Sequence, residues 1–146
     1  MKKFIIILVF CSTIFAQDKK ALPDFNKMWN YYNPQKTEQK FRKLLPIAEK
    51  SKNISYHTQL LTQIARAQGL QRKFKEAHKT LNTVKMMLTP KLFVAHIRYC
   101  LERGRVFNSS RMKKKSKPFF LKALRIATEK KQDFYAVDAA HMLGII

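Results

Sequence analysis

The eleven residues TEQKFRKLLPI (37–47) decide the fold, because their pattern of small and large apolar positions occurs three times in the chain. The pattern returns as AHKTLNTVKMM (77–87) and as SKPFFLKALRI (116–126), 40 and 39 residues further on. Each copy begins with a small residue, has a large apolar residue four positions later, and continues with apolar residues three and six positions after that. This spacing predicts one buried face of a helix.

A second helical pattern alternates with the first. It reads Leu61-x2-Ile64-Ala65, then Cys100-x3-Gly104, then Ala140-x2-Leu143-Gly144. A fixed period of this length with two helical patterns per unit predicts an all-α protein, a right-handed α-solenoid of antiparallel helix hairpins. Only 3 glycines occur, and no Asn-Gly or Asp-Gly pair is present to make a tight hairpin turn, which argues against an all-β domain.

Residues 1–16 have the composition of a secretory signal peptide. Lys2 and Lys3 give a basic start, Phe4–Phe10 is an unbroken apolar run, and Ala16 is a small residue before polar sequence begins. The run is shorter than the ~20 residues of a membrane-spanning helix, although an uncleaved anchor remains the alternative. We therefore expect export to the periplasm, the cell envelope or the outside of the cell. Phe10 stands where a lipoprotein signal has a small residue, so lipidation of Cys11 is not expected.

The charge is strongly unbalanced, with 30 Lys and Arg against 9 Asp and Glu and a formal net charge of +21. Such an excess attracts nucleic acid, anionic lipid headgroups or acidic glycans. Most of the basic residues are Lys, whereas base and phosphate recognition favours Arg. Together with export, this argues against nucleic acid and leaves peripheral contact with an anionic membrane or glycan as the alternative. The densest basic run, Lys113–Lys117, is expected to be a solvated corner between helices.

We divide the chain into the signal peptide (1–16), an N-terminal segment (17–36) with a short helix, and the repeat region (37–146). Within the repeats the patterns predict helices over 37–50, 55–70, 74–88, 90–108, 117–131 and 134–146. Pro46 lies inside the first of these helices and is expected to bend it or to leave one hydrogen bond unmade. The last helix has no partner and ends on apolar residues. We expect either a truncated copy of a longer protein, which we favour, or pairing of the exposed end with another chain.

These residues resemble the tetratricopeptide repeat family in a variety with long helices. Small residues let two helices cross closely in that family, and Ala65, Gly104 and Gly144 stand at the small position of the first helix. Ala77 and Ser116 match the small position of the second helix. The resemblance covers residues 37–144. The sequence departs from it at Arg103, where a large apolar residue is usual, and at Thr37, which replaces an alanine.

The resemblance implies that the first helices of the repeats line a concave groove. Arg66 and Arg105 fall at equivalent places 39 residues apart, which would put two guanidinium groups on one wall, suited to a carboxylate-bearing peptide. Two solvated arginines are the alternative. The groove positions carried over from the family are Gln59, Thr62, Arg66, Arg98, Leu101, Arg105, Asn108, Asp138 and His141.

The sequence offers little for catalysis. Three scattered glycines build no phosphate loop, and the four histidines lack the spacing of metal ligands. Cys100 stands at a packing position, so we expect a buried thiol. We therefore expect no enzyme, cofactor or metal, and predict a protein–protein interaction scaffold that binds a peptide or a helix of a partner in its groove. The alternatives are a truncated sensor segment of a larger signalling protein and a basic module for anionic surfaces.

Overall fold

The computed structural model describes residues 21–146, so the predicted signal peptide lies outside the described residues. Every regular element in this range is helical, and none of these helices combines the length and apolarity needed to cross a membrane. The prediction of an all-α chain is therefore confirmed for residues 21–146. The elements are the short 3-10 helix η1 (Phe25–Met28), α1 (Pro34–Ser51), α2 (Ile54–Leu70), α3 (Phe74–Met87), α4 (Phe93–Ser109), α5 (Lys113–Glu129) and α6 (Asp133–Gly144).

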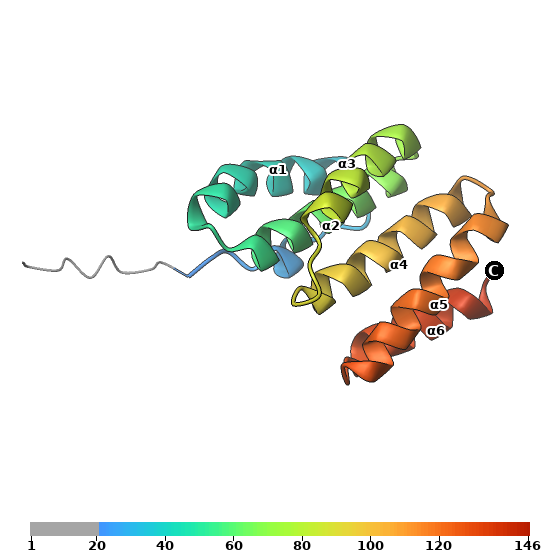
Figure 1. Cartoon of the computed structure of the whole chain (residues 1–146). Helices are drawn as coiled ribbons and strands as arrows, with labels where there is room; N and C mark the ends of the chain where they lie inside the picture. The colour runs from blue at the N-terminus through green and yellow to red at the C-terminus, as the bar shows by residue number, and fades with distance from the viewer. Residues whose placement is uncertain (1–20) are drawn as a thin grey trace, which may run out of the picture.

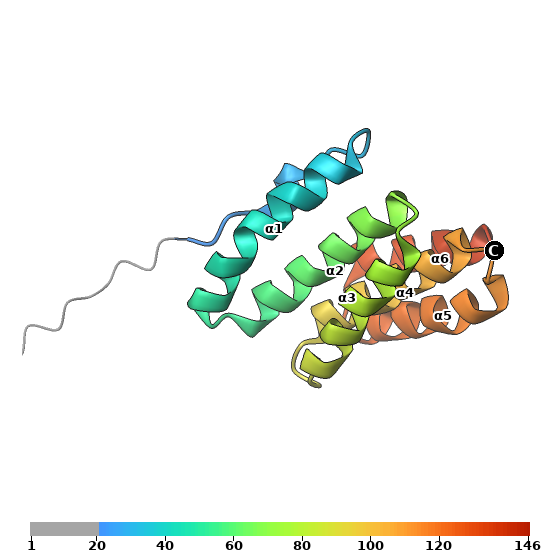
Figure 2. The ribbon, with the colours of Figure 1, turned by 90° about the horizontal axis from the view of Figure 1, so that it is seen from above.

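Each helix packs against the next helix along the chain (Figure 1). The strongest pairings are α1 with α2, α2 with α3, α4 with α5, and α5 with α6. In addition, α2 and α4 lie side by side, and α4 also touches α6, which brings together three helices that are not consecutive in sequence (Figure 2). The side chains of these three helices and of the N-terminal segment meet on one side of the molecule.

Short turns join most of the helices, and each turn holds one residue in the left-handed backbone region. After α2, Lys73 N donates to Gln68 O at 3.0 Å and closes the last turn of the helix, and the same bond recurs after α4 and α5. Glycine is the usual residue at this left-handed position because it has no Cβ to strain. Here basic side chains occupy it, with φ between 53° and 64°: Lys52, Arg72, Arg111 and Lys131.

The repeated pattern forms the buried core. The small position and the large position of all three copies have 0% exposure. Where the small residue is polar, its hydroxyl has a local partner: Thr37 Oγ1 donates to Asn30 O at 3.1 Å, and Ser116 Oγ donates to Lys113 O at 2.7 Å. The pattern is wrong only at its last position in the first copy, where Ile47 is 45% exposed. The residues at these small and large positions are Thr37, Phe41, Ala77, Leu81, Ser116 and Phe120.

The second pattern holds in α4 but not in α6. A Cβ built on Gly104 would lie 2.5 Å from the Phe120 ring, so α4 and α5 approach closely where the pattern predicts a small residue. Gly144, by contrast, has nothing within 4 Å of a built Cβ, and Ala140 is exposed. Within α6 it is Ala139 and Met142 that are buried, because no described helix packs on the other face.

Several boundaries differ from the sequence-based expectation; α4, for example, begins at Phe93 and not at residue 90. The short N-terminal helix is only the 3-10 turn η1, and α1 begins at Pro34, where proline suits the first helical position and Asn33 caps the helix by accepting from Lys36 N at 2.9 Å. Lys113–Lys115 is the first turn of α5 and not a corner before it. The hydrogen-bonded turn after α4 ends at Met112, which lets the lysines enter the helix.

Candidate functional site: an aromatic and arginine-lined groove

A groove with a volume of about 750 Å³ opens where the N-terminal segment, α2, α4 and α6 meet. Residues of the N-terminal segment, α2, α4 and α6 all contribute to its lining. Rings and charged groups dominate its lining. The lining residues are Asn26, Trp29, Tyr31, Gln63, Arg66, Arg98, Leu101, Glu102, Arg105, Asp133, Phe134, Tyr135, Val137, Asp138 and His141.

The structure brings most of the predicted groove residues together. Arg66, Arg98, Leu101, Arg105, Asp138 and His141 all line the groove. Asn108 lines an adjoining hollow that shares Arg66 and Arg105, and Gln59 lines a separate hollow beside Pro23 and Tyr56. Thr62, which the family resemblance placed in the groove, does not line it: the residue is fully buried, and its hydroxyl donates to Gln59 O at 2.6 Å.

The two equivalent arginines converge on a carboxylate of the chain itself. Arg66 Nη1 lies 3.2 Å from Glu102 Oε1, and Arg105 Nη1 lies 2.6 Å from the same oxygen. Arg105 Nη2 also pairs with Asp138. Glu102 is only 3% exposed, so its charge is compensated within the protein. The wall that the sequence predicts for a partner's carboxylate is thus already occupied by Glu102.

This network makes the groove electrically balanced. Arg66, Arg98 and Arg105 face three acids, Glu102, Asp133 and Asp138, although the chain as a whole has more than three basic residues for each acid. Burial alone would lower the pKa of Arg105, but the charges of Glu102 and Asp138 outweigh it and raise that pKa. A groove of this kind has no net attraction for a polyanion and favours partners that offer rings and hydrogen bonds.

The N-terminal segment is held against α2 and α4 beside this groove. Trp29 Nε1 donates to Gln63 Oε1 of α2 at 3.1 Å, and Tyr56 Oη donates to Pro23 O at 2.8 Å. Further along, Arg98 Nη2 of α4 donates to Asn26 Oδ1 at 2.9 Å. The composition of the segment shows its aromatic residues, but no periodic pattern in the sequence indicates where they dock.

Arginine and aromatic side chains alternate along the groove. The guanidinium carbon of Arg66 lies 5.9 Å from the centre of the Trp29 ring and 5.6 Å from that of Tyr31, and these two rings stack with centres 4.8 Å apart. Arg98 lies 5.7 Å from the Phe25 ring and 5.4 Å from the Tyr135 ring of α6. These are cation–π distances. They link the N-terminal segment to α2 through Arg66 and to α4 through Arg98, which also contacts Tyr135 of α6.

A second polar cluster lies between α3 and α4, away from the groove. Arg103 is 6% exposed; its Nη1 lies 2.7 Å from His78 Nδ1, and its Nη2 donates to Asn82 Oδ1 at 2.7 Å. Burial and the charges of Arg103 and Lys115 lower the pKa of His78. These partners explain how an arginine occupies a position where the repeat pattern has a large apolar residue.

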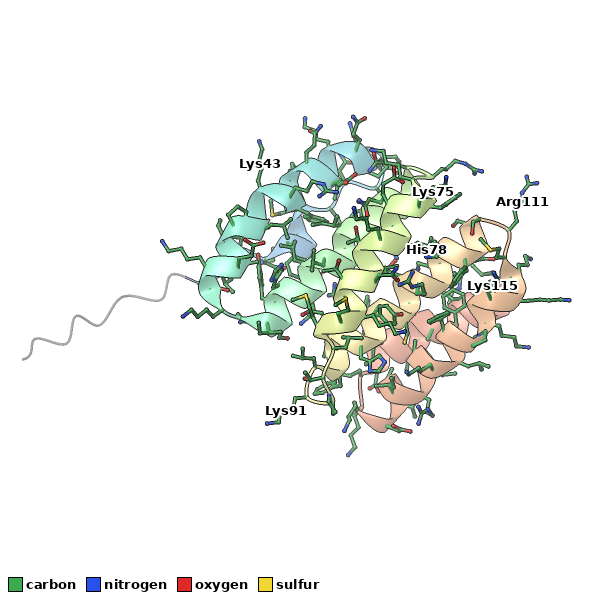
Figure 3. All side chains as sticks on the ribbon, turned by 45° about the horizontal axis from the view of Figure 1, so that its top comes forward. Lys43, Lys75, His78, Lys91, Arg111 and Lys115 are labelled. Atoms are coloured by element: carbon green, nitrogen blue, oxygen red, sulfur yellow. The ribbon has the colours of Figure 1, made fainter. Side chains whose placement is uncertain are left out.

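Basic side chains cover the outer side of the helices. Figure 3 shows Lys43, Lys75, Lys91 and Arg111 projecting outward from α1, α3 and the connections, and all four are exposed. The lysines of the first turn of α5 are exposed as well. This outer surface carries the charge excess that the groove lacks.

Cys100 is buried, as its position in the repeat predicts. Burial raises the pKa of its thiol to about 11, although nearby Lys122 acts in the opposite direction, so the thiol is protonated and unreactive near neutral pH. Among residues 21–146, no three His, Cys, Asp or Glu side chains gather closely enough to hold a metal ion.

In comparisons with known proteins, no protein-family model, curated protein or solved structure matches this chain.

Proposed function

We propose that the chain is a non-enzymatic interaction module of the tetratricopeptide-repeat type, whose groove receives a peptide or a helix of a partner protein. The support for this arrangement is the recurrence of buried positions at a period of 39 or 40 residues, together with the close crossing of α4 and α5 at Gly104. Repeats of this kind act by presenting a surface that neighbouring units build jointly.

One observation supports the proposal most: the groove is aromatic and charge-balanced, whereas the rest of the chain is strongly basic. Three of the nine acidic residues of the sequence lie in this one groove. Rings with polar tips and arginines are the residue types enriched at protein interfaces, and a volume of about 750 Å³ falls within the usual range of binding pockets.

The second candidate function is direct binding to an anionic membrane or glycan surface. The exposed lysines of the outer surface favour it (Figure 3). Such binding depends on net charge and weakens steeply between low and moderate salt, whereas groove binding depends on position.

Two charge-matched substitutions separate these candidates. Val137 lines the groove and is 70% exposed, and Leu121 of α5 lies outside the groove and is 48% exposed. Val137→Glu and Leu121→Glu each replace an exposed apolar side chain by one negative charge. Linear peptides are first selected on the immobilised protein from a phage-displayed library at moderate salt. We expect Val137→Glu to weaken the selected peptides at least tenfold and Leu121→Glu to leave them unchanged. Equal effects of the two substitutions would reject the groove and favour the charged surface.

We also propose that the mature protein is exported, on the basis of the composition of residues 1–16. Mass spectrometry of the protein from the cells that make it then gives an N-terminus at Gln17. An N-terminus at Met1 would instead support the retained anchor.

A further inference from the structure

We propose that the exposed face of α6 binds an amphipathic helix of another protein. This helix carries a small residue, a large apolar residue four positions later, and lysines on its outer side. The helices α3 and α5 have this pattern and already cover the equivalent faces of α2 and α4. The inference goes beyond the proposed function, because Ala140 and Gly144 of this face lie outside the groove lining.

Three positions that follow one face of the helix are buried in both α2 and α4. They are spaced by three and four residues, so they lie on the same side of each helix. None of the three is more than 9% exposed in α2, and all three are buried in α4. The positions are Thr58, Leu61 and Ala65 in α2, and Ile97, Cys100 and Gly104 in α4.

The same three positions are exposed in α6. Val137 is 70% exposed, and Ala140 and Gly144 are exposed as well. Phe134, one turn before Val137, is 78% exposed. α6 packs on α5 with its other side, where Ala139 is buried, and it lies at the end of the row of helices away from α1 (Figure 1). Within the part of the chain that the structure describes, no helix has the place on α6 that α3 has on α2 and α5 has on α4.

The contact between α4 and α5 shows what a covering helix needs. A Cβ built on Gly104 would lie 2.5 Å from the ring of Phe120, so the glycine makes room for that ring. Gly144 stands at the equivalent position of α6, and nothing lies within 4 Å of its built Cβ. This face can therefore accept a large apolar side chain from a second helix at the same kind of crossing.

Charge is divided between the two kinds of helix in the same way. α1, α3 and α5 contain four, three and five lysines, all of them exposed, whereas α2, α4 and α6 contain none. α6 also has no arginine, and its two acids are Asp133 and Asp138. A helix with lysines on its outer side thus meets no cation on α6. Burial of the exposed apolar area of this face favours its binding.

A second copy of the chain is a poor occupant of this face. α1 has the repeat pattern, but the N-terminal segment already covers its small and large positions. Thr37 Oγ1 donates to Asn30 O at 3.1 Å, and the centres of the Trp29 and Phe41 rings lie 5.2 Å apart. Pairing of two α6 helices would bring together the acids of both copies. The face is therefore suited to a helix of another protein.

The probe is a synthetic peptide with the sequence of α5, Lys113–Glu129, blocked at both ends and labelled with a fluorophore. The control peptide carries Phe120→Ala and has the same charge. Binding to the whole protein is measured by fluorescence anisotropy at moderate salt, which weakens attraction due to net charge alone. In the protein, Gly144→Leu fills the proposed crossing. Thr128→Leu adds the same side chain at an exposed position of α5 and is the matched control.

We expect the α5 peptide to bind the parent protein at least about tenfold more tightly than the Phe120→Ala peptide, because the ring is the side chain that fills the crossing. Gly144→Leu should weaken the α5 peptide at least about tenfold, and Thr128→Leu should leave its affinity unchanged. Because nothing lies within 4 Å of a Cβ at Gly144, the far-ultraviolet circular dichroism of this variant should match that of the parent protein.

Three results would each overturn the inference: no binding of the α5 peptide, equal binding of the Phe120→Ala peptide, or equal effects of the two leucine substitutions. Dimerisation of the protein alone that Gly144→Leu abolishes would also overturn it, since a second copy would then occupy the face.

The proposed function is tested separately with the phage-selected peptides. Val137 belongs both to the groove lining and to the exposed face of α6, whereas Gly144 belongs only to the face. Selected peptides that lose binding in Val137→Glu and keep it in Gly144→Leu occupy the groove, whether or not the α5 peptide binds.

Discussion

Replacing Gly104 by alanine tests the packing on which the groove depends. The added Cβ would lie 2.5, 2.7 and 2.8 Å from three atoms of the Phe120 ring. Real Cβ atoms do not approach other heavy atoms so closely, and Phe120 has 0% exposure, so the ring cannot swing into solvent. Either α4 and α5 must move apart or the ring must leave its preferred rotamer.

Two opposing effects set the size of the change. Overpacking a well-filled core costs about 1–3 kcal/mol. Exchanging glycine for alanine inside a helix stabilises the folded state by about 1 kcal/mol, because alanine has the higher helix propensity. Because three ring atoms are contacted and the ring is enclosed, we place the steric cost in the upper half of its range. The expected net loss is about 1–2 kcal/mol, or about 3–10 °C in Tm for a domain of this size.

The assay is urea unfolding followed by far-ultraviolet circular dichroism. Gly144→Ala is the matched control, since nothing lies within 4 Å of its added Cβ and its stability should be unchanged or slightly higher. Adding Phe120→Leu to Gly104→Ala should give a non-additive recovery of about 1 kcal/mol in a double-mutant cycle. Gly104→Ala as stable as the parent protein would refute the close crossing of α4 and α5.

Three further outcomes follow from local contacts. Burial and two neighbouring cations lower the pKa of His78, so the folded state binds fewer protons than the unfolded state. The contribution of His78 to stability is therefore complete above its unfolded pKa of about 6.5 and is lost as the pH falls through the lower native pKa. His78→Gln should partly flatten that fall in thermal unfolding between about pH 5 and 7.5, and an unchanged slope would contradict this. Arg72→Gly should raise the free energy of unfolding by about 0.5–1 kcal/mol, because glycine relieves the left-handed backbone strain at φ 60° at some entropic cost. A lower free energy of unfolding would show that the turn tolerates a side chain without strain. Glu102→Ala should lower the free energy of unfolding by about 2–4 kcal/mol in chemical denaturation, since it leaves two partly solvated arginines, Arg66 and Arg105, without their shared partner. A change below about 1 kcal/mol would mean that solvent already screens these ion pairs.

The sequence predicted the helical architecture well because burial repeats with a fixed period. Phe41, Leu81 and Phe120 recur in register, and each is fully buried. The prediction failed in α6, where the pattern names Ala140 and Gly144 but both are exposed. A repeat pattern predicts which face of a helix is suited to packing. That face is buried only where a second helix covers it.

The groove was predicted less completely, because its chemistry depends on contacts between residues far apart in the chain. The spacing of Arg66 and Arg105 placed both on the same wall, but nothing in it revealed that Glu102, 36 residues after Arg66, neutralises both. The seat of Trp29 on Gln63 was also missed. That segment has no periodicity, so its position follows only from the three-dimensional shape of the groove.

The most direct test of the groove as the interaction surface is site-specific photo-cross-linking in the cells that make the protein. A benzoylphenylalanine replaces exposed His141 in the groove and, in a matched variant, exposed Thr128 on α5 outside it. We expect a discrete adduct with one partner protein from position 141 and none from position 128. Adducts from position 128 alone, or the same products from both positions, would contradict the groove as the interaction surface.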